Sequence, residues 1–114
     1  MDRDHSLIFD ILESAQRIQD KTINMDFNEF EKDIDVQDIV IRRFAIIGEA
    51  VSRLSLEFRR HHPNLPYKEM KAMRNVLIHE YDYISNMVLW TTINDDIPSV
   101  VDSCKRILEE YNRD

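Results

Sequence analysis

Residues 74–81 read Arg-Asn-Val-Leu-Ile-His-Glu-Tyr, and this octet joins side chains that could act together on a phosphate. The guanidinium of Arg74 carries a permanent charge and can hold a phosphate through its fork of N–H donors. An imidazole has an unperturbed pKa of about 6.5, so His79 can accept or donate a proton near neutral pH. Phosphate binding and proton transfer are the two functions that cleavage of RNA without a metal ion requires.

RNA is the substrate that suits this pair, because its ribose 2′-hydroxyl supplies the nucleophile. His79 would act as the general base or acid, and Arg74 would stabilise the extra charge of the transition state. Asn75 could orient His79 or donate to a phosphate oxygen. The expected products are a 2′,3′-cyclic phosphate and a 5′-hydroxyl.

Helical geometry places a condition on this chemistry. Asn75 and His79 are four residues apart and share one face of a helix. Arg74 and His79 are five apart, or about 140° around the helix axis, so they do not lie above one another. The arginine stem could bring them together if the helix frays near His79, but a dimer is the more natural solution. Two copies of the helix facing each other would line one cleft with two Arg/His sets.

On spacing alone, a structural role for Arg74 and His79 is the more frequent outcome, since such pairs often arise by chance in helices. Tyr81, taken alone, is more often a packing residue at a helix end than a functional one. Met70, Met73 and Trp90 occur at helical intervals and are interpreted as core residues.

The elements that must position the octet are predicted to be helices. Apolar residues spaced three and four apart indicate a helix over residues 4–21, and residues 26–33 read as a linker with one short helix. A long helix is expected from residue 35 to residue 61, ended by Pro63. Gly48 lies inside it at a cost of about 1 kcal/mol relative to alanine, which suggests that another helix passes close by.

Pro66 opens the helix that carries the octet, and residues 81–83 are expected at or just beyond its end. Ser85 is a plausible cap for the next helix, Pro98 fits a fresh start or a kink, and a last helix reaches Tyr111. Residues 1–114 are therefore expected to form a single all-α domain, an up-and-down four-helix bundle with one additional short helix. A chain with one glycine and three prolines lacks the turn residues of a sheet protein.

The net charge of −7 is unevenly distributed. Residues 42–79 contain eight Lys or Arg and three Glu, a balance of +5, which leaves −12 for the remainder. This basic middle could bind an anion locally, and we expect Lys68 and Lys71 to contact RNA. An ordinary solvated helix face is an equally good interpretation of the arginines before residue 60.

Other classes of protein and site are disfavoured. No run approaches the roughly 18 apolar residues of a membrane span, and the N-terminus lacks the apolar core of a signal peptide. Cys104 is the only cysteine, which suggests a reduced, cytoplasmic protein. His5, His61 and His62 show no metal-ligand spacing, and one glycine cannot build a phosphate-cradling loop. Neither a metal nor another cofactor is expected.

The octet matches the motif Arg, Asn, three residues, His, one residue, Tyr, and in this it resembles the HEPN superfamily. It is most similar to the HepT toxins of HepT/MntA toxin–antitoxin pairs. The resemblance covers nearly the whole chain, because further residues follow the family pattern in order: Gly48-Glu49-Ala50, Leu54-Ser55, His62-Pro63, Pro66-Tyr67, Trp90 and Ile97-Pro98.

The resemblance implies a helical homodimer whose motif helices meet at the interface, and a metal-independent endoribonuclease acting on tRNA or mRNA. It implies that Arg74, Asn75 and His79 are the catalytic residues. It further implies that a partner antitoxin, similar to a minimal nucleotidyltransferase, transfers AMP from ATP to Tyr81. The adenylate would add negative charge and bulk where the RNA phosphate must bind.

Three alternatives remain open at the level of the sequence. The chain could be a non-catalytic helical module that only binds its nucleotidyltransferase. It could instead be the antitoxin, with the nucleotidyltransferase as the toxin. Finally, Arg74 and His79 could merely hold a dimer together, in which case their alanine variants would lose dimerisation rather than activity alone.

Overall fold

The computed structural model describes residues 2–79 and 84–113, and of His79 it describes the backbone alone. The described residues form helices joined by turns and no strand, as expected, with seven helices rather than the five predicted. Their bounds are α1 (Arg3–Thr22), α2 (Phe27–Lys32), α3 (Ile34–Arg53), α4 (Leu56–His61), α5 (Tyr67–His79), α6 (Asn86–Asp95) and α7 (Ile97–Arg113).

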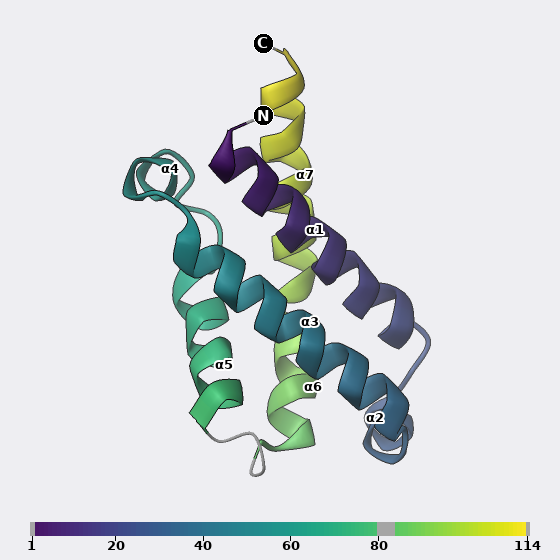
Figure 1. The fold of residues 1–114 in the computed structure, drawn as a ribbon. Helices are drawn as coiled ribbons and strands as arrows, with labels where there is room; N and C mark the ends of the chain where they lie inside the picture. The colour runs from purple at the N-terminus through teal and green to yellow at the C-terminus, as the bar shows by residue number, and fades with distance from the viewer. Residues whose placement is uncertain (1, 80–83, 114) are drawn as a thin grey trace.

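The helices pack in two layers around one apolar core. Figure 1 shows α1 and α3 side by side on one face of the molecule, with α6 and α7 running on from one another behind them. α5 lies along α3 on the side away from α1. The short helix α2 lies at the end of the bundle where α3 begins, in contact with α3 and α6. The fully buried side chains come from α1, α2, α3, α5, α6 and α7, and the largest are Phe30, Phe44, Ile8, Ile11, Ile18, Ile47, Met70, Leu89 and Ile97.

The prediction of one long helix over residues 35–61 is wrong, because the chain turns at Leu54 and Ser55. Leu54 is extended and buried, and Ser55 caps the new helix by accepting a hydrogen bond from the amide of Phe58 at 3.1 Å. The carboxylate of Asp4 accepts two bonds from Ser55, at 2.9 Å from its amide and 2.7 Å from its hydroxyl. Asp4 on α1 therefore stabilises the turn that separates α3 from α4.

Arg59 closes the same turn from the other side. Its Nη2 donates to the carbonyl oxygens of Val51 and Ser52 at the end of α3, at 2.9 and 3.3 Å, and the carbonyl of Val51 also accepts from the amide of Leu54. The guanidinium also lies 5.9 Å above the ring of Tyr67. The hydroxyl of Tyr67 donates to the carbonyl of His62, and burial raises the pKa of this phenol to about 12. These contacts fix where α5 begins.

The remaining predicted boundaries agree closely with the structure. The helix predicted over 4–21 is α1, and the short helix predicted within 26–33 is α2, which carries a reciprocal capping box between Asp26 and Glu29. Ser85 caps α6 as predicted. Pro98 lies in the first turn of α7, so it marks a fresh start after Asp96.

Both ends of the described chain lie at the same end of the bundle, where the ring of His5 stacks on that of Tyr111 at 4.3 Å. No helix among residues 2–79 and 84–113 has the length and apolar character that a membrane crossing needs.

Candidate functional site

Helix α5 presents the predicted site on two of its faces. Met70, Met73 and Leu77, spaced three and four apart, are buried against the core, as predicted for the two methionines. The opposite face is exposed and carries Lys68, Lys71 and Asn75, and the helical position of His79 continues this row. Arg74 lies between the two faces, on the side of α5 that meets α3.

Gly48 lets α5 approach α3 closely at Arg74. A Cβ atom added at Gly48 would lie 2.2 Å from the Cβ of Arg74, 3.0 Å from its Cγ and 3.1 Å from the carbonyl oxygen of Met70. No side chain fits at such distances, so the stem of Arg74 rests directly on the backbone of α3. The prediction that another helix passes close to Gly48 is confirmed, and that helix is the one carrying the octet.

The guanidinium of Arg74 is held by Glu49, the residue after Gly48. The Nη2 of Arg74 lies 2.9 Å from the Oε2 of Glu49, a charge-assisted contact between α5 and α3. The arginine side chain is 27% exposed and that of the glutamate 54%. The Nε of Arg74 is buried and has no hydrogen-bond partner among the described residues.

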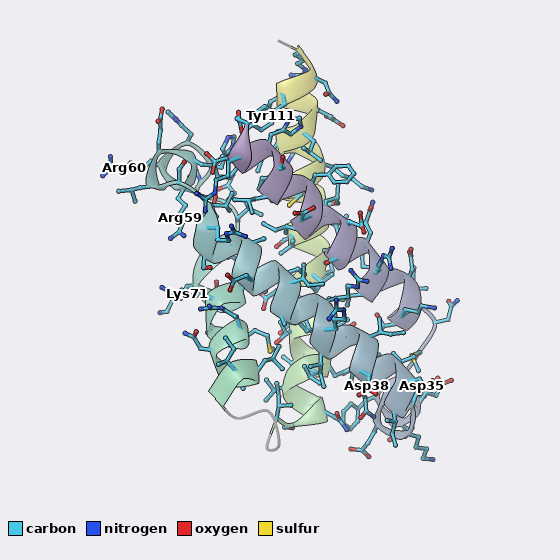
Figure 2. All side chains as sticks on the ribbon, in the orientation of Figure 1. Asp35, Asp38, Arg59, Arg60, Lys71 and Tyr111 are labelled. Carbon is cyan, nitrogen blue, oxygen red and sulfur yellow. The ribbon has the colours of Figure 1, made fainter. Side chains whose placement is uncertain are left out.

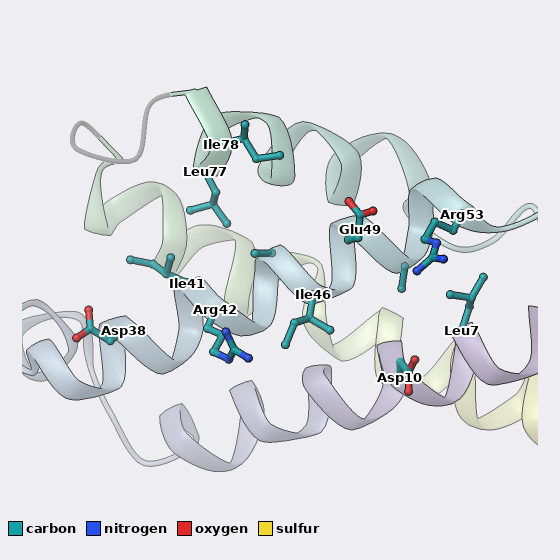
Figure 3. Close-up of a pocket in the computed structure, with 12 residues that line it drawn as sticks. Leu7, Asp10, Asp38, Ile41, Arg42, Ile46, Glu49, Arg53, Leu77 and Ile78 are labelled. Carbon is teal, nitrogen blue, oxygen red and sulfur yellow. The ribbon is translucent and has the colours of Figure 1, made fainter.

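Beside this ion pair lies an open groove of about 640 Å³ between α1, α3 and α5. Figure 3 shows α3 running along it, with Leu7 and Asp10 of α1 on one side and Leu77 and Ile78 of α5 on the other. The apolar lining residues are Leu7, Ile41, Ala45, Ile46, Ala50, Leu77 and Ile78. Ile78 is 57% exposed, so the apolar surface continues out of the groove onto the end of α5.

Charges of both signs surround the apolar part of this groove. Arg42 and Arg53 line it together with Asp10, Asp38 and Glu49. A surface that carries both signs beside apolar side chains can pair with a second copy of itself, because a two-fold axis brings each residue opposite a different one. The arrangement is therefore compatible with the dimer that the helical geometry favours.

The basic segment does not form one patch. Arg42 and Arg53 line the groove, Arg59 caps α3, and Lys71 lies exposed on α5. Figure 2 shows Arg60 and Lys71 beside α4 and α5, far from Asp35 and Asp38 at the opposite end of α3. The end of the molecule formed by α4 and α5 is thus the more basic one.

Of the predicted site residues, Arg74 packs against Gly48 and pairs with Glu49. Lys68, Lys71 and Asn75 lie on the exposed face of α5. His79 ends α5, with Asn75 one helical turn before it. Tyr81 lies outside the described residues, as does the neighbouring Tyr83. Within the part of the chain that the structure describes, no three His, Cys, Asp or Glu side chains gather in a way that could hold a metal ion.

Two features of the site were not predicted, namely the role of Glu49 and the groove. The sequence did contain a pattern that marks the groove, namely a second stripe of residues on α3 that faces away from the core. Its members recur at helical intervals and are Asp38, Ile41, Ala45, Glu49 and Arg53. A charged residue in a stripe of this kind gives no indication of its partner, which in this case lies on another helix.

Comparison with known proteins identifies the family of the chain. The family model described as "Ribonuclease HepT-like" matches residues 11–107. A protein of Thermococcus cleftensis named "Probable ribonuclease HepT" is 41% identical over 101 residues, which cover 88% of this chain and 92% of the relative. A candidate RNase of Methanocaldococcus jannaschii is 40% identical over 95 residues, covering 83% of this chain and 87% of the relative.

A candidate RNase of Caldanaerobacter subterraneus subsp. tengcongensis is 36% identical over 100 residues, with 88% of this chain and 89% of the relative covered. No solved structure matches the chain at a significant level. The matched span includes the α3–α5 contact, the exposed row of α5 and the whole octet. With this extent of agreement, the chain belongs to the HepT-like ribonuclease family.

Proposed function

We propose that this protein is a metal-independent endoribonuclease, the toxin of a toxin–antitoxin pair, with Arg74, Asn75 and His79 as its catalytic residues. Membership of the HepT-like ribonuclease family supports the RNase activity. The observation that carries the assignment of the site is the fixed position of Arg74, whose stem rests on Gly48 and whose guanidinium meets Glu49. Such a guanidinium is oriented before the phosphate arrives.

In the proposed reaction the ribose 2′-oxygen attacks the adjacent phosphorus. The new bond joins the 2′-oxygen to phosphorus, and the bond from phosphorus to the 5′-oxygen breaks. The imidazole of His79 takes the proton of the 2′-hydroxyl, and the imidazolium so formed gives a proton to the departing 5′-oxygen. Arg74 neutralises the charge that builds up on the phosphate oxygens, and Asn75, one turn before His79, orients the imidazole or donates to the phosphate.

The active form that we propose is a homodimer. Arg74 and His79 are separated by about 140° on α5, so one copy of the helix does not direct both toward the same phosphate. The mixed-charge groove and the exposed Ile78 supply a self-complementary surface next to α5. Two copies joined there would bring the Arg74 of one protomer near the His79 of its partner. The exposed Lys68 and Lys71 would guide the RNA backbone toward the shared cleft.

Neutralisation is proposed to occur by adenylylation of Tyr81 by a nucleotidyltransferase antitoxin. The phenol oxygen attacks the α-phosphorus of ATP, pyrophosphate departs and the phenolic proton passes to solvent. The adenylate then places a negative phosphate two residues from His79, where it repels the RNA phosphate. Intact-mass measurement after expression with and without the neighbouring gene tests this step. The mass of one AMP or a small multiple should be gained, kept in Tyr83→Phe and lost in Tyr81→Phe.

The nuclease activity is tested by incubating purified, unmodified protein with total tRNA in the presence of a chelator. Cleavage to 2′,3′-cyclic phosphate ends is expected, and Arg74→Ala and His79→Ala should each abolish it while the helical circular dichroism is kept. Arg17→Ala, which removes an exposed ion-paired arginine from α1, and His61→Ala, at the exposed end of α4, are the matched controls. Cleavage by His79→Ala would refute the proposed mechanism.

A further inference from the structure

Glu49 forms the one ion pair that joins two different helices among the described residues. The other described pair, Arg17 with Glu13, links successive turns of α1 at 3.6 Å. The 2.9 Å distance between Arg74 and Glu49 is that of a direct charge-assisted hydrogen bond. Glu49 thus binds the proposed catalytic arginine and no other described basic residue.

The contact constrains Arg74 at its far end, while Gly48 constrains it near the backbone. The absent side chain at Gly48 leaves the Cβ and Cγ of Arg74 lying on α3. The Nε, which is next along the side chain, is buried. Glu49 binds Nη2, one of the two terminal nitrogens. Two consecutive residues of α3 therefore fix both the path of the side chain and the orientation of its guanidinium.

This arrangement leaves donors available for a phosphate. A guanidinium has five N–H groups in a rigid fork, and the contact with the Oε2 of Glu49 is made through Nη2 alone. The N–H groups of Nη1 are not engaged by any described residue. A carboxylate at one edge of the fork can hold the plane of the guanidinium while another edge binds an anion.

We propose that Glu49 is a positioning residue for the ribonuclease reaction, acting through Arg74. This inference rests on the proposed function and deepens it. Glu49 contacts neither RNA nor the reacting atoms. It holds the guanidinium in the orientation in which the Nη1 edge meets the scissile phosphate, so that no reorientation is required in the transition state.

The experiment compares the kinetics of Glu49→Ala and Glu49→Gln with those of the wild type. Glu49→Ala should lower kcat by about 10- to 100-fold, the effect of a small misplacement of a catalytic group. KM should stay unchanged or fall, because a negative charge near the RNA has been removed. Glu49→Gln should recover part of kcat, since the amide oxygen still accepts from Nη2. Glu13→Gln is the matched control, because it neutralises a similarly exposed ion-paired glutamate, 50% exposed against 54%.

Two results would overturn the proposal. If KM falls while kcat is unchanged in Glu49→Gln and Glu49→Ala, the carboxylate competes with the phosphate and does not position the arginine. If Glu49→Gln and Glu49→Ala keep wild-type kcat and KM and alter only the midpoint of thermal unfolding, the ion pair is purely structural.

A measurement that does not depend on cleavage separates this proposal from the proposed function. The Nε–Hε signal of Arg74 in a ¹⁵N correlation spectrum, assigned by its loss in Arg74→Lys, should be protected from exchange in the wild type. It should broaden or vanish in Glu49→Ala and remain in Glu13→Gln. A wild type that cleaves no RNA would refute the proposed function, and a signal insensitive to Glu49→Ala would refute the positioning role.

Discussion

The arginines of this protein differ in what their N–H groups meet. Arg59 and Arg74 each bury an Nε that has no partner among the described residues. The Nη2 of Arg59 donates to two carbonyl oxygens at the end of α3, whereas the Nη2 of Arg74 meets the carboxylate of Glu49. Arg59 therefore acts as a helix cap, and Arg74 remains able to bind an anion. The amino-acid composition cannot distinguish these two roles, because both arginines belong to the basic segment of residues 42–79.

Removing the Arg59 cap should destabilise the fold. Arg59→Ala removes the side-chain donor from both carbonyls at the end of α3, so that of Val51 keeps only the amide of Leu54, at 3.3 Å. We expect it to lower the free energy of unfolding by about 1–2 kcal/mol. Arg60→Ala, which removes an exposed arginine from the same helix, should change it by less than about 0.5 kcal/mol. Urea denaturation followed by circular dichroism measures both, and equal effects would contradict the capping role.

The burial of Cys104 can be tested through the pH dependence of the free energy of unfolding. The thiol is fully buried in α7, and desolvation raises its pKa from an ordinary 9.0 to about 12. The unfolded chain ionises first, so this group's contribution to stability is constant below about pH 9 and is lost as pH rises through 12. The stability difference between wild type and Cys104→Ala should therefore change across that range and not below it.

The same thiol should resist modification in the folded protein. At pH 8 we expect a disulfide reagent to react with Cys104 only after denaturant is added. Rapid reaction of the native protein would show that α7 opens readily.

The helices divide into those that the sequence predicts and those that depend on distant contacts. Apolar spacing predicted α1 and α5 because each buries one face against the core. The break between α3 and α4 was missed because the apolar pattern continues through it. The capping serine is held by Asp4, 51 residues earlier, and no local pattern contains that contact. The extra helices arise at Ser55, through this contact, and at Asp96, where only local bonds are seen and where Pro98 had already allowed a fresh start.

The α3–α5 contact should not tolerate a side chain at Gly48. Gly48→Ala gains about 1 kcal/mol of helix propensity, but its Cβ would lie 2.2 Å from that of Arg74, and overpacking costs about 1–3 kcal/mol. We expect a net loss of stability together with displacement of Arg74, hence a lower kcat. Ser52→Ala, on the same helix, removes only a partly exposed hydroxyl that donates to the carbonyl of Glu49 within that helix, and it should leave kcat unchanged and stability within about 0.5 kcal/mol. A Gly48→Ala protein with full stability and activity would refute the close approach.

The complete site can be predicted only in part from one chain. The octet identified Arg74, and the resemblance placed Gly48-Glu49 within the family pattern without giving it a role. The ion pair itself required the fold, because its partners are on different helices. Likewise, the groove emerges only when α1, α3 and α5 are assembled. Helical geometry alone, through the angle between Arg74 and His79, indicated that two copies are needed.

Sharing of the site between protomers can be tested by complementation. Arg74→Ala and His79→Ala proteins, each inactive, should regain activity when unfolded and refolded together. Random assortment makes half of the dimers mixed, and a mixed dimer keeps one intact site of two, so about one quarter of wild-type activity is expected. Refolding each variant alone is the control. If the mixture stays inactive, the site lies within one protomer.

The proposed interface has its own test. Ile78→Arg places a charge on the exposed apolar residue beside the groove and should convert the protein to a monomer in sedimentation analysis. Val88→Arg on α6 changes a similarly exposed residue, 48% against 57%, and should leave the assembly unchanged. Monomers from both variants, or from neither, would refute an interface at this groove.

The stacking of His5 on Tyr111 has a consequence for synthesis. Helix α1 is synthesised well before α7, yet α7 is one of its two main partners. The apolar face of α1 therefore stays partly uncovered until the residues of α7 have been made. The bundle closes late in synthesis, after α3 and α5 have already been translated.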